Sequence, residues 1–310
     1  MNNILITGGA GFIGSKFVEH IYRTTKYHIT VLDKLTYAAN SDRLPKHIKE
    51  DEERFNLLVG DICDITADDL PDLNYIVNFA AESHVDNSIL DGRPFVRSNI
   101  EGVFNLLELA KKQPKLRKFV QVSTDEVYGD MEDLHGSPEA TESFALKPSS
   151  YYSASKAAAE MLVIAAHRTF DLPYLITRCC NNFGPGQHAE KFLPTVFEAM
   201  RNNRPIPVYG DGLQIREWIH TSDHVSIMAN LMHSSYDAET YNIGSGFSYT
   251  NLEVIEKISE ELGIPANIEY VADRLGHDRK YALDCKKLKA YGGDRIFEPL
   301  ENFIKRESGN

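Results

Sequence analysis

The sequence predicts an α/β fold, a doubly wound parallel sheet with a second, smaller lobe. Apolar runs with β-branched residues recur along the first 180 positions, and segments with helical spacing separate them. Glycine-rich or polar residues follow several runs directly, and ligands of open parallel sheets lie at such strand ends. We expect the main domain to comprise residues 1–180 with a returning segment at about 218–244, and the smaller lobe to comprise 181–217 and 245–310.

Composition and charge narrow the class of protein. Of the 310 residues, 42% are hydrophobic and 25% are charged, as in ordinary globular proteins. The formal net charge of −12 argues against nucleic acid as a bulk electrostatic partner. It leaves room for an anionic small molecule, because a local basic pocket can lie on an acidic surface.

The cysteines and the apolar runs indicate in which cellular compartment the protein functions. Cys63, Cys179, Cys180 and Cys285 lack the spacing of a metal site, so we expect reduced thiols and no metal. We see no signal peptide before the first strand, and no apolar run approaches the ~20 residues that span a membrane. These features predict a soluble protein of the cytoplasm.

A glycine-rich turn follows the first predicted strand, residues 3–7. Gly8, Gly11 and Gly14 lie in this turn, and a segment with helical spacing, residues 15–23, comes next. A tight turn of this kind lets the backbone approach a pyrophosphate, which then lies against the N-terminus of the helix. In this strand–turn–helix context, the pattern favours a dinucleotide site over a structural turn that binds no phosphate.

An acidic residue refines the choice of dinucleotide. The second predicted strand, residues 28–32, ends at Asp33, nineteen residues after Gly14. A carboxylate at this distance can accept hydrogen bonds from the ribose hydroxyls of adenosine, which favours NAD over NADP. The next two predicted strands end at residues 60–62 and 80–84, and both ends would line the same crevice.

Two adjacent carboxylates, Asp125 and Glu126, follow a buried strand predicted at residues 117–122. Neighbouring residues that leave a strand need not share a face, so the two side chains can reach different atoms of one substrate. An acid and a base aimed at neighbouring carbons suit a dehydration. The competing interpretation is a solvated acidic turn.

A strong helix is predicted at residues 152–170. Tyr152 and Lys156 are four residues apart, so they lie on one face of this helix. An ammonium beside a phenol lowers the pKa of the phenol, which would make Tyr152 a base near neutral pH. Tyr151 is the rival, but Ser155 stands where it would need a lysine, and an incidental surface pair is the alternative.

The elements after residue 180 alternate between the sheet and the smaller lobe. We predict a turn at 181–186, helices at 190–201, 222–233 and 250–262 with Thr250 as N-cap, an edge strand at 206–210 and a returning strand at 241–243. Earlier in the chain, we predict a long helix at 96–112 and a polar loop over the site at 131–148.

The smaller lobe carries dispersed cations of the kind that bind an anionic diphosphate: Lys191, Arg216, Arg274, His277, Arg279 and Lys280. Nearby carboxylates such as Glu217 and Asp273 make ion pairing the competing explanation. Tyr209 suits either stacking on a base or packing within the lobe.

Together these motifs resemble a known family. The glycine turn, the stretch Ser123-Thr124-Asp125-Glu126-Val127-Tyr128-Gly129 and the pattern Tyr152-Ser-Ala-Ser-Lys156 resemble the extended short-chain dehydrogenase/reductases, and within them the dTDP-glucose 4,6-dehydratases. The similarity runs across nearly the whole chain. The Thr-Asp-Glu triplet is its specific part, because related epimerases share the fold and the Tyr/Lys pair but lack paired carboxylates at this point.

The resemblance implies a Rossmann-type domain that holds NAD and a smaller substrate-binding lobe that holds a nucleotide sugar. The residues implied around the cofactor are Gly8, Gly11, Phe12, Ile13, Gly14, Asp33, Lys34, Leu35, Thr36, Asp61, Ile62, Ala80, Ala81, Glu82, Ser83, Ser98, Tyr152, Lys156 and Asn182. Those implied to face the substrate are His84, Thr124, Asn181, Glu190, Lys191, Pro207, Val208, Tyr209, Arg216, Asn251, Asp273, Arg274, Leu275, Gly276 and His277. Family members are commonly homodimers that pair two long helices, here 96–112 and 152–170.

The resemblance also implies catalytic roles for Thr124, Asp125, Glu126, Tyr152 and Lys156. Tyr152, poised by Lys156 and with Thr124 near the same hydroxyl, takes the proton of the C4 hydroxyl while hydride passes to NAD. The new ketone acidifies C5–H, which Glu126 removes, and protonated Asp125 donates to the C6 hydroxyl, which leaves as water. Hydride then returns to C6 and gives a 4-keto-6-deoxy sugar.

Three departures from the family pattern leave the sugar and the nucleotide open. Asn87 stands where the family usually has Arg, Leu275 stands where Pro is usual, and the C-terminal stretch from Phe297 is shorter. UDP-glucose or a UDP-N-acetylhexosamine is therefore an alternative substrate for the same dehydration. A sugar-nucleotide 4-epimerase, which needs no acid and base beyond the Tyr/Lys pair, is the runner-up, and a non-catalytic NAD-sensing scaffold is the third reading.

Overall fold

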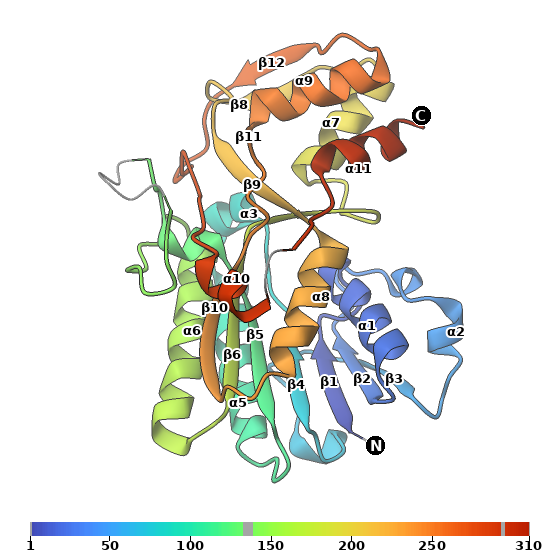
Figure 1. Ribbon diagram of the computed structural model, residues 1–310, viewed down its shortest axis with the longest axis vertical. Helices are drawn as coiled ribbons and strands as arrows, with labels where there is room; N and C mark the ends of the chain where they lie inside the picture. Colours follow the sequence, from blue (N-terminus) through green and yellow to red (C-terminus); the bar gives the residue numbers. More distant parts are fainter. Residues whose placement is uncertain (1, 133–138, 293–294, 310) are drawn as a thin grey trace.

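A seven-stranded parallel sheet forms the main body of the computed structural model, which describes residues 2–132, 139–292 and 295–309. Its strand order is β10-β6-β5-β4-β1-β2-β3 (Figure 1). The bounds are β1 Asn3–Thr7, β2 His28–Asp33, β3 Phe55–Val59, β4 Tyr75–Asn78, β5 Lys118–Thr124, β6 Tyr174–Cys179 and β10 Ala238–Ile243. The prediction of a doubly wound α/β fold is confirmed.

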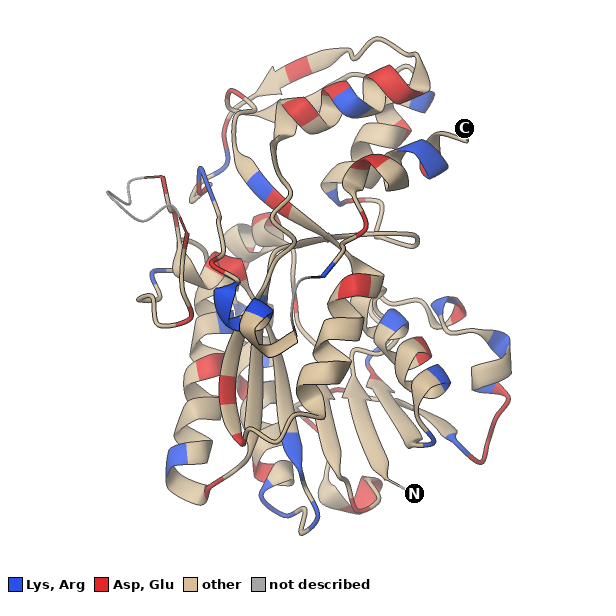
Figure 2. Cartoon of the chain, in the orientation of Figure 1, with Lys and Arg blue, Asp and Glu red and all other residues tan. Residues whose placement is uncertain are grey.

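Alternation along the strands explains why helices cover both faces of this sheet. In β1, Ile4 and Ile6 belong to the apolar core under α1 (Phe12–Thr24) and α8 (Thr221–Met232), whereas Leu5 belongs to the core under α5 and α6. Successive side chains of a strand point to opposite faces, so a run without polar residues is buried on both sides. Few charged residues lie on these strands, and most charges lie on helices and loops (Figure 2).

The helix predicted at 96–112 is longer at its start and is interrupted. It runs through α4 (Arg93–Val96), a π-helical turn at Arg97–Glu101 and α5 (Gly102–Ala110). At Gly102 a Cβ atom would lie 2.5 Å from Cδ1 of Ile62, so the helix approaches the end of β3 closely there. The second long helix, α6, spans Tyr151–Phe170 as predicted, and Ser150 caps it.

The smaller lobe contains two small sheets and three helices, and the C-terminus lies in it (Figure 1). One sheet has the order β11-β9-β7 and the other pairs β12 with β8. The elements are β7 Asn181–Phe183, β8 Ile206–Tyr209, β9 Ile215–His220, β11 Ser248–Thr250, β12 Ile268–Val271, α7 Phe192–Arg201, α9 Asn251–Leu262 and α11 Leu300–Ser308. They enclose a separate core around Trp218 and Phe183.

Several local predictions after residue 180 are confirmed and others are wrong. Strand β10 joins the large sheet beside β6, as expected for 241–243, and the Thr250 hydroxyl caps α9 by accepting from the amide of Glu253. The turn predicted at 181–186 is wrong at its start, because β7 pairs with β9 there. Strand β9 was not predicted. The domain boundaries themselves stay a prediction.

The remaining helices are short. They are α2 Lys46–Lys49, α3 Val85–Leu90, α10 Lys286–Gly292 and the 3₁₀ turns at Ser41–Arg43, Ala67–Asp69 and Asp125–Tyr128, of which the last is η4. The predicted loop at 131–148 falls partly outside the described residues. No helix in the described part of the chain combines the length and apolar character needed to cross a membrane.

Candidate active site

A cavity of about 1200 Å³ lies at the carboxyl ends of the parallel strands. The predicted residues that line it are Gly8, Gly11, Phe12, Ile13, Gly14, Asp33, Lys34, Thr36, Asp61, Ile62, Ala80, Ala81, Glu82, Ser83, Ser98, Thr124, Asp125, Glu126, Tyr152, Lys156, Asn181, Asn182, Glu190 and Lys191. Predicted residues that are not part of this lining are Leu35, His84, Pro207, Val208, Tyr209, Arg216, Asn251, Asp273, Arg274, Leu275, Gly276 and His277.

The glycine turn after β1 is shaped by close backbone contacts. Gly8 has φ +67°, and a Cβ atom there would lie 2.6 Å from the amide nitrogen of Ala80. A Cβ atom at Gly14 would collide with the carbonyl oxygen of Gly8. The N-terminus of α1 lines the cavity through Gly11, Phe12, Ile13 and Gly14, and no side chain caps it. Such a terminus favours an anion.

Two carboxylates lie beside this turn, at the ends of β2 and β3. Asp33 is buried, and its oxygens accept from the amides of Ala10 and Leu35 at 2.9 Å each. Burial opposes the ionisation of Asp61, but hydrogen bonds from Lys34 and Cys63 lower its pKa to about 2. Each oxygen of an ionised carboxylate can accept a further hydrogen bond, so both can receive ribose hydroxyls.

Opposite the glycine turn, β5 ends in the turn η4 that carries the two predicted carboxyl groups. The Thr124 hydroxyl donates to Asp125 at 3.1 Å and accepts from the amide of Glu126 at 3.3 Å. The turn ends at Gly129, whose φ is +75° and where a Cβ atom would collide with the carbonyl of Lys147. The turn therefore depends on glycine at this position.

The carboxyl group of Asp125 lies in surroundings that favour its protonated form. Asp125 is 2% exposed, and its Oδ2 atom has no hydrogen-bond partner among the described residues. Burial, and then the neighbouring Glu126, raises the pKa of Asp125 well above its ordinary value. Burial also raises the pKa of Glu126, but the cations Arg274, Arg216 and Lys191 oppose this rise. The two adjacent carboxyl groups therefore differ in acidity.

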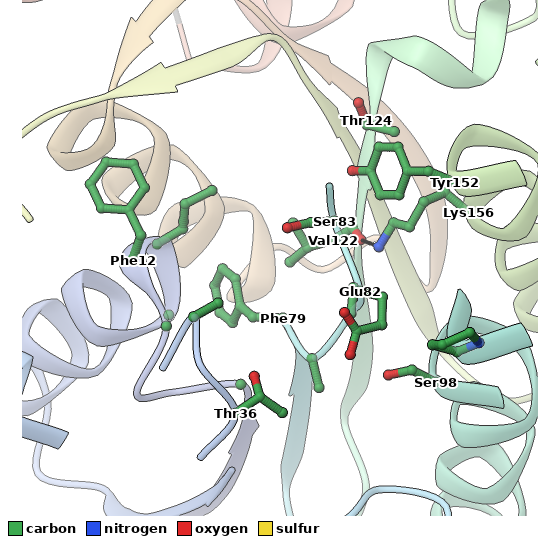
Figure 3. A pocket seen from close by; sticks show the side chains of 18 of the residues that line it. Phe12, Thr36, Phe79, Glu82, Ser83, Ser98, Val122, Thr124, Tyr152 and Lys156 are labelled. Atoms are coloured by element: carbon green, nitrogen blue, oxygen red, sulfur yellow. Dashed lines mark hydrogen bonds between the residues drawn. The ribbon is translucent and has the colours of Figure 1, made fainter. Parts of the chain in front are cut away.

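Tyr152 and Lys156 face the same space from the first turns of α6, and the hydroxyls of Tyr152 and Thr124 lie side by side (Figure 3). The predicted lowering of the Tyr152 pKa is wrong for the chain by itself. Burial raises this pKa well above its ordinary value, Glu126 and Asp125 raise it further, and the hydrogen bond with Thr124 opposes them. The Lys156 ammonium instead donates to the carbonyl of Val122 at 2.6 Å (Figure 3). Burial lowers the pKa of Lys156 to about 8.

The structure separates the two candidate tyrosines. Both line the cavity, but Tyr151 is 65% exposed and packs beside Gly92, whereas Tyr152 lies next to Thr124. The loop after β4 is held by Asn99, which accepts from the amide of Glu82 and donates to Ser155 at 2.8 Å. Sequence reasoning missed Asn99 and Ser155. Ser155 lies three residues after Tyr152, so helical spacing could have placed it on the same face, but no spacing shows that it meets Asn99.

Sequence reasoning also missed cavity residues outside the motifs. They include Ala38 and Ala39 after β2, Asp91, Gly92, Arg93, Pro94, Val96, Arg97 and Glu101 from the first long helix and its entry, Cys179 and Cys180 at the end of β6, and Gln187 and His188 from the loop before α7. The helical residues lie within two turns of Ser98, so its neighbours at helical spacing were the available signal. No sequence signal pointed to Cys179, Cys180, Gln187 or His188.

Several candidates of the smaller lobe form ion pairs and hydrogen bonds outside the cavity, whereas Asn181, Glu190 and Lys191 line it. Asp86 accepts from the Tyr209 hydroxyl at 3.2 Å and lies 3.6 Å from Arg274, while His277 contacts Asp273 at 2.6 Å. We call Asp86, Tyr209, Asp273, Arg274 and His277 the cross-lobe cluster, because Asp86 lies on α3 and the others on the smaller lobe.

The remaining candidates that do not line the cavity are buried, exposed or in contact with neighbouring polar residues. Arg216 is buried, where it donates to the carbonyl of Asp278 at 2.8 Å and lies over the ring of Tyr281. Val208 is buried in the lobe core, and Leu275 is 76% exposed. Pro207 is exposed on β8, and Gly276 has φ +63° against the carbonyl of Ser149. Asn251 contacts Gln214, and His84 lies 4.0 Å from Glu190.

Comparison with known proteins gives the family. Residues 4–244 match the model of the NAD dependent epimerase/dehydratase family. This chain belongs to that family. Among the family's curated members, the low-salt glycan biosynthesis protein Agl12 of Haloferax volcanii is 45% identical over 94% of this chain and 92% of its own length. A dTDP-glucose 4,6-dehydratase of Neisseria gonorrhoeae is 42% identical over 99% of this chain and 93% of its own.

Solved structures within the family are also similar. The dTDP-glucose 4,6-dehydratase DesIV of Streptomyces venezuelae, solved with NAD bound, gives a TM-score of 0.93 at 39% identity over 99% of this chain and 96% of its own. The UDP-glucuronic acid 4-epimerase of Bacillus cereus, solved with UDP-glucuronic acid and NAD, gives 0.90 at 25% identity over 99% of this chain and 98% of its own.

Proposed function

We propose that this chain is an NAD-dependent nucleotide-sugar 4,6-dehydratase and that its substrate is dTDP-glucose. The observation that carries the proposal is the pair Asp125 and Glu126, which share one cavity with Tyr152 and with the glycine turn. A 4-epimerase needs only the Tyr/Lys pair and the cofactor, and a scaffold needs neither. The dehydratases among the relatives, at about 40% identity over nearly the whole chain, support the same activity.

The residues around the glycine turn fit NAD. The N-terminus of α1 would hold the pyrophosphate, Asp33 the adenosine ribose, and Asp61 with Ile62 the adenine. Lys156 and Tyr152 would hold the nicotinamide end. When bound, NAD supplies a reversible hydride acceptor, and its positive ring favours the phenolate of Tyr152.

Tyr152 and Thr124 act in the oxidation at C4. Their hydroxyls lie side by side, so both can contact one substrate hydroxyl (Figure 3). Tyr152 accepts the C4 hydroxyl proton, and the hydrogen bond between Thr124 and Tyr152 opposes the rise in the phenol's pKa. Lys156 is fixed by the carbonyl of Val122, and it adds a positive charge one turn from the phenol.

Elimination of water falls to Asp125 and Glu126. The carbonyl at C4 makes the C5 proton acidic, and Glu126 accepts this proton. The raised pKa of Asp125 keeps it protonated, so it can donate its proton to the C6 hydroxyl. The C6–O bond breaks, one water leaves, and a C5–C6 double bond remains for reduction at C6. Reduction at C6 then needs a proton at C5, which Glu126 returns, and the proton held by Tyr152 must pass to Asp125 before the next turnover.

We further propose a homodimer through α5 and α6. Large apolar side chains are exposed on these helices and at their starts: Val96 at 47%, Phe104 at 53%, Tyr151 at 65%, Met161 at 48% and Phe170 at 56%. Two-fold pairing would bury them in a four-helix arrangement. Light scattering should give twice the chain mass for the wild type and a monomer for Phe104→Glu. A monomeric wild type would contradict the pairing.

The decisive experiment incubates the purified chain with dTDP-, UDP-, GDP- and CDP-hexoses and measures product mass. A 4,6-dehydratase gives a product lighter by one water, with dTDP-glucose turned over fastest. A product of unchanged mass but altered stereochemistry would instead identify a 4-epimerase. Faster turnover of a UDP-hexose would refute the choice of substrate but keep the reaction.

A further inference from the structure

A buried ion pair lies behind the active site, between α6 and β6. Arg178 and Glu160 are 4% and 0% exposed, and two guanidinium nitrogens reach the carboxylate at 3.1 and 2.6 Å. Neither residue lines the cavity, among the residues the structure describes. Burying two charges brings a desolvation penalty that often cancels their attraction, so stability alone is a weak reason for such a pair.

The carboxylate end of the pair holds the strand that leads into the catalytic turn. The Ser123 hydroxyl donates to Oε1 of Glu160 at 2.5 Å, and Ser123 directly precedes Thr124. Glu160 itself lies one helical turn after Lys156, on the same face of α6. One carboxylate therefore joins the helix of Tyr152 and Lys156 to the start of η4.

The guanidinium end holds the other side of η4. Arg178 donates to the Tyr128 hydroxyl at 2.8 Å and lies 4.9 Å from the centre of the Tyr128 ring. Tyr128 is the last residue of η4 and is 1% exposed, and its hydroxyl donates to Asn242 of β10 at 2.7 Å. The short turn that carries Asp125 and Glu126 is thus fixed immediately before its first residues and at its end.

We propose that Glu160 and Arg178 are positioning residues that fix the carboxyl groups of η4 relative to Tyr152 and Lys156. The proposal rests on the proposed function, because the two sets of groups must act on adjacent carbons of one sugar. Among the described residues, the Arg178 guanidinium donates to Glu160, to the Tyr128 hydroxyl and to the carbonyl of Glu142. Glu160 contacts the residue before the turn, and Tyr128 is the last residue of the turn. Misplacement of catalytic groups by about 1 Å can lower a rate by ~100-fold.

Two variants release the turn to different extents, and each has a matched control. Tyr128→Phe removes one hydroxyl and keeps the buried ring, so we expect it to fold, and Arg178→Lys removes the forked contacts. The controls are Tyr22→Phe and Arg54→Lys. Tyr22 donates to Asp51 at 2.6 Å, and Arg54 lies 4.2 Å from the Tyr22 ring and donates to backbone carbonyls, far from the cavity.

The first measurement is single-turnover kinetics with dTDP-glucose, in which substrate oxidation is followed by absorbance and water loss by mass. For Tyr128→Phe we expect water loss to slow at least about tenfold and more than oxidation does, with KM within about twofold. Arg178→Lys should slow both steps more strongly. The controls should lower the melting temperature and leave the ratio of the two rates unchanged. If Tyr128→Phe and Arg178→Lys behave like the controls, the pair is merely structural and the proposal is wrong.

The second measurement is hydrogen exchange of residues 123–129 in the chain without substrate. Exchange in this segment should accelerate about tenfold or more in the two test variants and stay at the wild-type rate in the controls. Wild-type exchange in Arg178→Lys would overturn the proposal. An inactive wild type would contradict the proposed function instead, and the exchange measurement would still decide whether the pair holds the turn.

Discussion

The catalytic turn and the cross-lobe cluster hold their polar groups in different ways. At the turn, Thr124, Asp125 and Lys156 are each less than a tenth exposed, and they contact hydroxyls and backbone carbonyls. In the cross-lobe cluster, Tyr209 is 39% exposed, and Arg274 and His277 are paired with carboxylates of the protein itself.

The difference indicates that the turn serves catalysis and that the cluster serves substrate binding. Fixed, buried groups need no reorganisation during the reaction, although an unpartnered buried carboxyl lowers stability. The ion pairs of the cluster are partly buried, with side-chain exposures of 21% for Arg274 and 46% for Asp273. An arriving diphosphate can therefore reach the cations and replace a protein carboxylate. We therefore expect substitutions at the turn to lower kcat and those in the cluster to change KM.

The largest effect should come from Tyr152→Phe. Removing the phenol that is placed to accept the C4 proton should lower kcat by about 10³-fold. Steady-state kinetics with dTDP-glucose checks this, with Tyr236→Phe as a control because Tyr236 is half-exposed and distant from the cavity. If Tyr152→Phe retained a tenth of wild-type activity, another base would have to act at C4.

Asp125→Asn and Glu126→Gln should follow, each with kcat lowered by about 10²- to 10³-fold. Because these residues act after the oxidation, both variants should still oxidise the sugar in a single turnover. Mass spectrometry should then find little dehydrated product. Equal loss of oxidation and of water elimination would show that the two carboxyl groups serve binding instead.

Stability should change with pH in a direction set by Asp125. Burial raises the pKa of Asp125 in the folded chain, so its contribution to stability is full below the ordinary pKa of an aspartate and is lost as pH rises through the folded value. Asp125→Asn should therefore be more stable than wild type at pH 7, by about 1 kcal/mol or more, and the difference should shrink towards pH 4. Urea unfolding at both pH values tests this. A variant less stable than wild type at pH 7 would contradict the buried, unpartnered carboxyl.

The smallest effects should lie in the cross-lobe cluster. Arg274→Ala should raise KM for dTDP-glucose about tenfold by removing a charged donor for the diphosphate, with kcat within about twofold. Asp86→Asn should lower KM by about threefold, because it releases Arg274 and Tyr209 from their carboxylate. If both variants raised KM, or both lowered it, the idea that the diphosphate replaces Asp86 as the partner of Arg274 would be refuted.

The sequence predicted the parts of the site that depend on local spacing. Gly8 to Gly14, Asp33 and the Thr124–Glu126 triplet follow strands directly, and Tyr152 and Lys156 share one helix face, so topology alone brings them to one cavity. Strand β9 was missed because Arg216 and Glu217 suggest a surface segment. In the structure both are buried, and Glu217 accepts from the amide of Gly246.

Contacts between distant positions could not be predicted in this way. Nothing in a spacing pattern joins Glu160 to Ser123 and Arg178, which come from three elements. The prediction that Lys156 lowers the pKa of Tyr152 was wrong for the same reason. The helix geometry showed Lys156 nearby, but not the carbonyl of Val122 that takes its ammonium, nor the carboxyl groups that surround the phenol.

Strand β10 has a consequence for how the chain can be divided. It completes the large sheet only after the chain has passed through the smaller lobe, and α8, which precedes it, covers the same face of the sheet as α1. A fragment that stopped after β6 would leave the hydrogen-bonding edge of β6 and the apolar side of α1 open to water and to aggregation. The large sheet therefore cannot be excised as the continuous segment 1–180, because α8 and β10 come from the chain beyond it.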